Sequence, residues 1–289
     1  MDNFKGMAWM TLAMLGFALA DMSIIILSRD LPVGQIIFLL GVAGAIGFGI
    51  WARLQGHRLV SPVLLTRPVL LRNAAEMLAT VAFISALAFI PLSTLSAVIQ
   101  ANPLIVTLGA ALFLGESVGW RRWTAIFVGL AGVLVIIRPG TMAFEPSILL
   151  AVVAVIGLSL RDLATRPVPK TVPTAILSTY SFAAAALAGL VITPFFGSFV
   201  AVEIAWLGWL AFGAVMNMVA IFAITAAMRV GEIAVVTPFR YTRLVFALVI
   251  AILVFGERPD AWTLIGASIV VASGLYTFWR EAQMRRGTA

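Results

Sequence analysis

Ten runs of about 20 apolar residues follow one another along this chain, separated by short polar or Pro- and Gly-containing turns. A helix of this length, rising about 1.5 Å per residue, crosses the hydrocarbon core of a bilayer, which is about 30 Å thick. Because lipid offers no partner to backbone polar groups, uninterrupted apolar runs of this length favour membrane-spanning helices. The predicted helices are 6–27, 33–52, 68–89, 92–114, 121–138, 147–166, 173–196, 204–228, 232–255 and 261–280.

Composition supports an all-α polytopic membrane protein rather than a water-soluble fold. Of the 289 residues, 62% are hydrophobic and 11% are charged, whereas soluble domains carry about 25% charged residues. Cysteine is absent, so we expect no disulfide, no thiolate metal site and no cysteine nucleophile. The first apolar run is long enough to span the membrane, and we therefore expect it to be a helix rather than a cleaved signal peptide.

The distribution of Lys and Arg predicts the orientation of the chain. With ten helices, both termini lie on the same side of the membrane. Fourteen of the 19 Lys and Arg residues fall on that side, three fall on the other, and two lie inside the ninth predicted helix. The positive-inside rule places both termini in the cytoplasm. The same spread over short loops explains the net charge of +7, so we expect no nucleic-acid partner.

An internal repeat divides the chain into two halves of five helices. Because five is odd, the second half crosses the membrane in the opposite sense, as in secondary transporters that bind substrate near the midplane between the repeats. We expect residues 1–140 and 146–289 to be the two repeats of one transmembrane domain, 1–289, built around a central cavity. At an offset of 141 residues, without gaps, the matches are Gly16 with Gly157, Asp21 with Asp162, and Leu114-Gly115-Glu116 with Phe255-Gly256-Glu257.

Two arginines lie near the middle of the ninth predicted helix. Arg240 and Arg243 sit where a charge costs roughly 2.5–3.5 kcal/mol even on a lenient insertion scale, so they call for a functional explanation. One interpretation is that one or both bind an anionic group, such as a substrate carboxylate. The alternative is that they neutralise intramembrane carboxylates, since buried charges are normally paired. The candidate carboxylates are Asp21, Glu76 and Asp162.

Those carboxylates have two interpretations as well. In a transporter they can relay a coupling proton or charge, because burial and neighbouring charges shift the pKa of a carboxyl group. Alternatively, they form salt bridges within the bundle. Arg161 adjoins Asp162, and Arg72 precedes Glu76 by four residues on the same helical face.

The repeat offset also pairs polar residues within the spans. Prolines interrupt the repeat-related fourth and ninth helices, at Pro103 and Pro238, and such interruptions point to a transporter binding site. The alternative is ordinary helix packing by small polar residues. The pairs at the offset are Glu76 with Asn217, Gln100 with Tyr241, and Asn102 with Arg243.

Metal-binding and catalytic motifs are not evident in the sequence, and its many glycines have a different role. We find no metal-ligand constellation, no Gly-rich phosphate loop and no Ser/His pairing, so we expect no metal, no cofactor and no enzymatic activity. The glycines are expected to allow close helix packing. They include Gly41, Gly44, Gly47, Gly49, Gly129 and Gly132.

Two pairs of short segments resemble the drug/metabolite transporter superfamily, EamA type. They are Ala86–Ser93 with Leu114-Gly115-Glu116, and Ala227–Ala234 with Phe255-Gly256-Glu257. The resemblance covers essentially the whole chain and is nearest to the bacterial aromatic amino-acid exporters. It implies a bacterial inner-membrane exporter of amino acids or related metabolites, which works by alternating access around a largely apolar cavity.

The predicted function is therefore export of small metabolites, in particular amino acids with apolar or aromatic side chains, by a carrier that needs only one chain. The alternatives are an exporter of cationic drugs or nucleotide-like compounds, a polytopic membrane enzyme acting on lipid, and a channel or assembly factor. The candidate substrate-binding residues are Arg240, Arg243, Tyr241, Gln100, Asn102, Glu76, Asn217, Asp21, Thr80 and Phe83.

Overall fold

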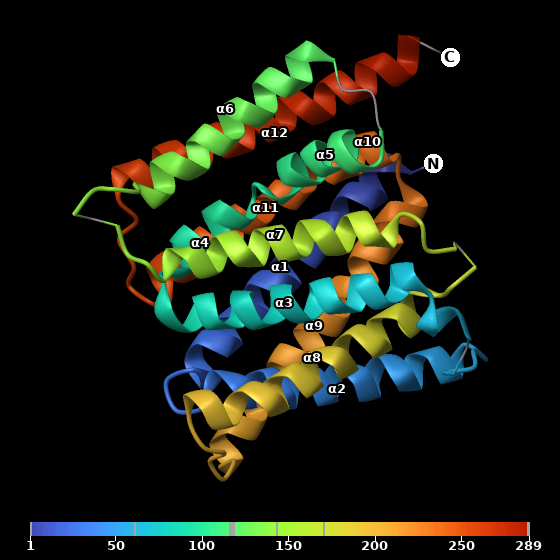
Figure 1. Ribbon diagram of the computed structural model, residues 1–289, viewed down its shortest axis with the longest axis vertical. Helices are drawn as coiled ribbons and strands as arrows, with labels where there is room; N and C mark the ends of the chain where they lie inside the picture. The colour runs from blue at the N-terminus through green and yellow to red at the C-terminus, as the bar shows by residue number, and fades with distance from the viewer. Residues whose placement is uncertain (1, 61, 116–118, 143, 170, 288–289) are drawn as a thin grey trace.

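The computed structural model describes residues 2–60, 62–115, 119–142, 144–169 and 171–287, and every regular element among them is helical. The all-α, polytopic fold expected from the apolar runs is confirmed. The helices run between the two sides of the molecule, and α1 and α9 cross obliquely to α3 and α7 (Figure 1). They are α1 (Asn3–Leu27), α2 (Val33–Leu54), η1 (Pro62–Leu65), α3 (Arg67–Phe89), α4 (Leu92–Ile99), α5 (Asn102–Phe113), α6 (Trp120–Ile137), α7 (Ile148–Thr165), α8 (Thr174–Phe196), α9 (Ile204–Val230), α10 (Ile233–Val236), η2 (Thr237–Tyr241), α11 (Thr242–Leu253) and α12 (Ala261–Gly287).

Two of the predicted spans are broken in the middle. Within the described residues, nine segments are long and apolar enough to cross a membrane, and α4 with α5 counts as one of them. The prediction of one continuous helix over 232–255 is wrong: that span consists of α10, η2 and α11. Pro238 lies in the 3₁₀ turn η2, where its missing N–H removes an α-helical hydrogen bond. Pro103 lies in the first turn of α5, just after the other break.

The packing of the helices follows a pseudo-two-fold pattern. Helix α1 packs along α9, and its counterpart at the 141-residue offset, α7, packs along α3, the counterpart of α9. The remaining close pairs, α2 with α8 and α6 with α12, each join equivalent helices of the two halves. These two pairs form the opposite ends of the molecule in Figure 1, while α4, α5 and α11 run through its interior. This arrangement agrees with the predicted inverted repeat.

Glycines set the distance between the paired helices. A Cβ at Gly41 of α2 would lie 2.6 Å from the backbone nitrogen of Ala186 on α8. A Cβ at Gly132 of α6 would lie 3.0 Å from the backbone oxygen of Gly266 on α12. Since such contacts leave no room for a side chain, these glycines allow the backbones to approach closely, as predicted.

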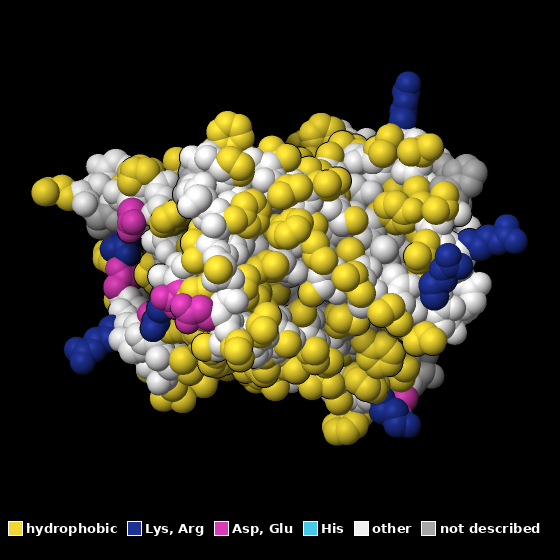
Figure 2. Space-filling model, turned by 90° about the horizontal axis from the view of Figure 1, so that it is seen from below, with side chains coloured by type: hydrophobic (Ala, Val, Ile, Leu, Met, Phe, Trp, Pro, Cys, Tyr) yellow, Lys and Arg dark blue, Asp and Glu magenta, His cyan; other side chains and the backbone are white. Residues whose placement is uncertain are grey.

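The surface separates apolar and charged side chains. In Figure 2, hydrophobic side chains cover the middle of the visible face. Lys and Arg stand out at both ends, and most of the visible Asp and Glu lie at the end opposite the chain termini. Many large apolar side chains are exposed on the outer faces of the helices, including Ile46, Ile50 and Val128. A surface of this kind is typical of a chain that crosses a bilayer several times.

Candidate functional site

Arg243, one of the two arginines in the ninth span, is neutralised by a buried carboxylate. Its Nη2 lies 2.7 Å from Oδ2 of Asp21 on α1, and the Asp21 residue is only 4% exposed. The guanidinium carbon also lies 5.2 Å from the ring centroid of Phe17 and 5.3 Å from that of Phe83. The ion pair and two aromatic faces together compensate for removing this charge from water. One of the expected pairings of an intramembrane arginine with a carboxylate is thus present in the structure, between Arg243 and Asp21.

This bridge between the two halves has a counterpart in which the halves exchange roles. Asn102 Nδ2 of α5 donates to Asp162 Oδ2 of α7 over 3.1 Å. At the repeat offset, Asp21 corresponds to Asp162, and Arg243 corresponds to Asn102. The helices α5 and α11, which follow the two breaks, are therefore equivalent in their contacts: α5 is joined to Asp162 of α7, and α11 is joined to Asp21 of α1. The two bridges differ in charge, since one uses a guanidinium and the other a neutral amide.

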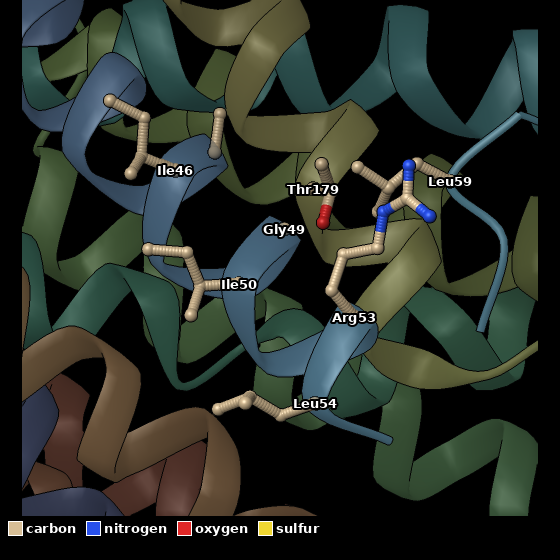
Figure 3. Close-up of a pocket in the computed structure, with 8 residues that line it drawn as sticks. Ile46, Gly49, Ile50, Arg53, Leu54, Leu59 and Thr179 are labelled. Atoms are coloured by element: carbon tan, nitrogen blue, oxygen red, sulfur yellow. The ribbon is translucent and has the colours of Figure 1, made fainter. Parts of the chain in front are cut away.

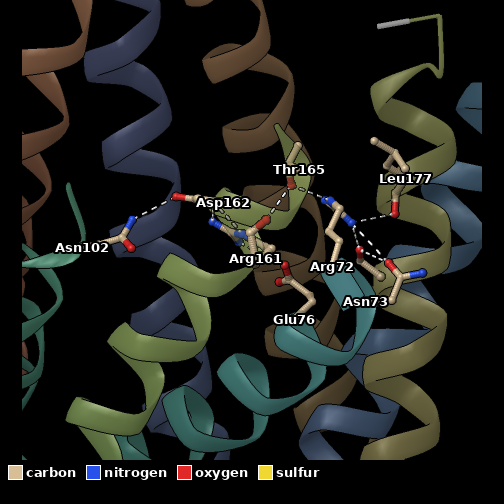
Figure 4. A network of polar contacts seen from close by, with 9 residues as sticks. Arg72, Asn73, Glu76, Asn102, Arg161, Asp162, Thr165 and Leu177 are labelled. Atoms are coloured by element: carbon tan, nitrogen blue, oxygen red, sulfur yellow. Dashed lines mark hydrogen bonds and ion pairs between the residues drawn. The ribbon is translucent and has the colours of Figure 1, made fainter. Parts of the chain in front are cut away.

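Arg161 links Asp162 to a further carboxylate in the same region, that of Glu76 (Figure 4). Its Nη1 lies 3.1 Å from Oε2 of Glu76 on α3, and its Nη2 lies 2.8 Å from Oδ1 of Asp162. The Ser159 hydroxyl donates to Asn102 Oδ1 over 2.8 Å and extends the network into α5. One guanidinium thus serves two carboxylates, and hydrogen bonds hold the remaining acceptors in place.

Arg72 and Arg161 were expected near the cytoplasmic ends of their helices, and in the structure both join the interior network. The predicted pairing of Arg72 with Glu76 is wrong: within the described residues no ion pair joins them, and Arg161 contacts the Glu76 carboxylate instead. Arg72 instead donates to the hydroxyls of Thr165 and Ser181, and the Nε to Oγ1 distance to Thr165 is 3.1 Å. In the sequence, the signal for these contacts was an arginine close to Asp162 and another close to Glu76. The packing of the helices decided which arginine contacts which carboxylate.

Gln100 and Tyr241 meet where the two broken spans cross. The Gln100 Nε2 donates to the backbone oxygen of Tyr241 over 3.2 Å. The Tyr241 phenol points elsewhere: its ring packs edge-on against Phe278 of α12, and a Cβ at Gly274 would collide with its hydroxyl oxygen. The Tyr241 side chain is therefore directed away from the arginine–carboxylate pairs, and it is the backbone oxygen of Tyr241 that accepts the hydrogen bond from Gln100.

Arg240 in η2 differs from Arg243 because it makes no ion pair within 4.0 Å and no hydrogen bond to any described residue. Its side chain is half-buried, and the negative charge of Asp162 acts on it only through space. Asn217 of α9 and Thr80 of α3 are likewise half-buried, and neither side chain makes a hydrogen bond to a described residue. These three candidate residues thus keep polar groups available for a ligand.

The Gly-Glu segment at the end of the ninth span reverses the chain. Gly256 has φ of 66°, a left-handed conformation that suits glycine, and the turn brings Glu257 onto the first turn of α4. Glu257 accepts from the backbone nitrogens of Leu92 and Ser93, at 2.7 and 3.1 Å, which satisfies unpaired helix N–H groups. Glu116, the matching residue of the first half, lies outside the described residues.

Comparison with known proteins agrees with the two-repeat architecture. The sequence profile of the "EamA-like transporter family" matches this chain twice, over residues 4–138 and 145–279. The second match begins and ends 141 residues after the first, the same offset that aligns the two halves. A solved crystal structure matches 92% of this chain and 97% of its own, with a TM-score of 0.60 and 20% identity, which supports the fold.

Curated relatives are transporters of several metabolites. An S-adenosylmethionine uptake transporter of Rickettsia felis is 29% identical over 66% of this chain and 64% of its own length, so this chain spans less than two thirds of that relative. A riboflavin transporter of Rhizobium johnstonii is 28% identical over 78% of this chain and 72% of its own. The pseudopaline exporter CntI of Pseudomonas aeruginosa is 29% identical over 85% and 86%.

Proposed function

We propose, on the premise that this chain belongs to the EamA-like transporter family, that it exports small metabolites bearing a carboxylate across the bacterial inner membrane. The favoured substrates are amino acids with apolar or aromatic side chains. Both termini lie in the cytoplasm, one chain is the working unit, and the two halves expose the centre to each side of the membrane in turn.

The observation that carries this proposal is the difference between the two central arginines. Arg243 is already satisfied by Asp21 and two phenyl rings. Arg240 lies in the break of the same span and has no direct partner among the described residues. A guanidinium in this environment is costly unless a ligand or counterion meets it, and its planar fork suits a carboxylate. Arg240 is therefore assigned the carboxylate of the substrate.

The charge inventory of the interior supports an anionic group on the substrate. Within the part of the chain that the structure describes, the central network contains one more arginine than carboxylate. A substrate carboxylate balances this excess without a change in the protein. The arginines are Arg72, Arg161, Arg240 and Arg243, and the carboxylates are Asp21, Glu76 and Asp162.

The three interior carboxylates are proposed as a charge relay during the transport cycle. Asp21 and Glu76 each bind one arginine, and Asp162 binds both Arg161 and Asn102. A proton can occupy one of these groups only as its bridge opens. Protonation would therefore be coupled to movement of the helices that the bridges hold.

Counterflow into liposomes tests the proposal. Proteoliposomes loaded with unlabelled phenylalanine should accumulate labelled phenylalanine, and Arg240→Gln should slow this exchange by roughly 10- to 100-fold, the worth of a charged hydrogen bond. Arg240→Lys should retain part of the activity, and Arg58→Gln, at an exposed loop arginine, should match the wild type. Normal exchange by a folded Arg240→Gln protein would remove Arg240 from the substrate site. Uptake without trans-acceleration would indicate a pore, and chemical conversion an enzyme.

A second candidate is transport of nucleoside- or flavin-containing compounds. It is favoured by the relatives named for S-adenosylmethionine and riboflavin. The same counterflow assay separates the two, because each compound is added outside as a competitor. If riboflavin or S-adenosylmethionine inhibits phenylalanine exchange at much lower concentration than aromatic amino acids do, the second candidate replaces the first.

A further inference from the structure

A groove lies between α2 and α8 on the outer face of the bundle, away from the arginine network (Figure 3). It encloses about 440 Å³ and is almost entirely apolar. The charged group in its lining is the Arg53 side chain, near the end of α2 on the side of the chain termini. Its walls include Ala45, Ile46, Ile50, Leu59 and Thr179.

The helix packing explains why this groove is there. Farther from the terminal side, α2 and α8 touch so closely that a Cβ at Gly41 would lie 2.6 Å from the Ala186 nitrogen. At Gly49, the nearest side-chain atom is the Thr179 methyl carbon, and a Cβ would lie 3.7 Å from it. The close backbone contact at Gly41 is thus not repeated at Gly49, and the missing side chain of this glycine leaves a hollow at the surface, while the neighbouring Phe48 and Ala52 are fully buried.

The opposite end of the molecule repeats this arrangement between α6 and α12. A second groove of about 440 Å³ is lined by Trp120, Arg121, Val128, Ile269 and Tyr276, among others. Farther from the terminal side, Gly132 of α6 and Gly266 of α12 bring the two backbones together. Both outer pairs thus carry a surface groove in the half of the molecule that carries the termini.

We propose that the two grooves bind anionic glycerophospholipids from the leaflet on the terminal side, with one acyl chain in each groove and the headgroup phosphate at Arg53 or Arg121. Both grooves open onto the lateral surface that the bilayer covers, where Ile46 and Ile50 are 58% and 56% exposed. Each has an arginine and no acidic residue in its lining, which complements a phosphate.

The second groove adds the aromatic residues expected at the headgroup level. The Arg121 guanidinium lies 5.4 Å from the ring centroid of Trp120, and Tyr276 packs against Trp279. Aromatic side chains anchor membrane proteins at the interface between headgroups and acyl chains. A phosphate at Arg121 would therefore lie at the depth at which lipid phosphates occur.

Native mass spectrometry of the full-length protein tests this assignment. Detergent-purified protein is titrated with phosphatidylglycerol and with phosphatidylcholine of the same acyl chains. Two phosphatidylglycerol molecules should bind more tightly than phosphatidylcholine, and Arg53→Gln with Arg121→Gln should weaken phosphatidylglycerol binding about fivefold per groove, to the level of phosphatidylcholine. The matched control is Arg58→Gln with Arg67→Gln, which removes two exposed charges outside the grooves and should leave binding unchanged.

Filling the first groove provides an independent arm. A Cβ at Gly49 makes only an ordinary contact with Thr179, so Gly49→Leu should fill the groove, and one lipid should be lost while the fold, followed by circular dichroism, is kept. Equal binding of the two lipids to the wild type, or equal losses in the control and the Arg53/Arg121 variant, would overturn the proposal. A dimer that dissociates when Gly49→Leu is introduced would assign the groove to a second copy of the chain instead.

Discussion

The Gln100 side chain donates to the Tyr241 main chain across 3.2 Å, and these two residues are separated by the repeat offset of 141. Equivalent positions of two inverted halves can touch only near the pseudo-two-fold axis that relates them. The axis therefore passes close to the breaks of the fourth and ninth spans. The two aspartate bridges, Arg243 with Asp21 and Asn102 with Asp162, belong to the same two spans.

Removal of Asp21 should strongly destabilise the protein. In the Asp21→Asn variant, Arg243 stays buried without its counterion, which typically costs about 3–5 kcal/mol. Thermal unfolding in detergent measures the loss. The double variant Asp21→Asn with Arg243→Gln should recover much of it, because no unpaired charge remains. Additive losses in the double variant would contradict the ion pair.

Glu76→Gln should cost less than Asp21→Asn in the same assay. Arg161 retains Asp162 after the substitution, so its guanidinium is not left without a carboxylate. We expect a loss of about 1 kcal/mol, the worth of an ordinary hydrogen bond. A loss as large as that of Asp21→Asn would show that Glu76, rather than Asp162, is the main counterion of Arg161.

Two glycines of α2 should respond oppositely to alanine. A Cβ at Gly41 would lie 2.6 Å from the Ala186 nitrogen and 2.8 Å from its Cα, so Gly41→Ala forces α2 from α8 and should cost about 1–3 kcal/mol. Gly49→Ala makes only an ordinary contact with Thr179, and the higher helix propensity of alanine should leave stability equal or up to about 1 kcal/mol greater. The same unfolding assay serves for both, and equal effects would contradict the difference in packing between Gly41 and Gly49.

Asp260 should confer stability that disappears in acid. Burial raises the pKa of this carboxyl, but hydrogen bonds from Thr263 and the adjacent Arg138 guanidinium outweigh that effect and hold the pKa below its usual value of 3.8. A carboxyl whose pKa is lower in the folded state than in the unfolded state stabilises the protein at pH values above the unfolded-state pKa. This stabilisation is lost as the pH falls through the folded-state pKa. The melting temperature of Asp260→Asn should therefore lie below that of the wild type by a constant amount from pH 7 to about pH 5, and the gap should close below about pH 4. A gap that widens in acid would reverse the assigned sign.

Much of the fold could be predicted from the pattern of apolar residues. Apolar runs of spanning length determine transmembrane helices with little help from tertiary contacts, since lipid forces the backbone to bond locally. The offset of 141 was readable because equivalent helices preserve Gly16 with Gly157 and Asp21 with Asp162. The continuous ninth helix was the error. Pro238 marks the position, but the extent of the 3₁₀ turn over Thr237–Tyr241 depends on the residues that pack around it.

The sequence alone determined that charges lie inside the membrane and that the two halves are equivalent, because composition and periodicity act locally along the chain. Only the tertiary structure decided which charges meet. Arg243 reaches Asp21, 222 residues earlier in the chain, whereas Arg240, three residues before Arg243, reaches no described partner. Interaction energies between charges in a medium of low dielectric constant depend steeply on distance and direction. Those distances are set by the packing of helices far apart in sequence. For this reason the sequence indicated which arginines and carboxylates were candidates for ion pairs, but not which of them pair.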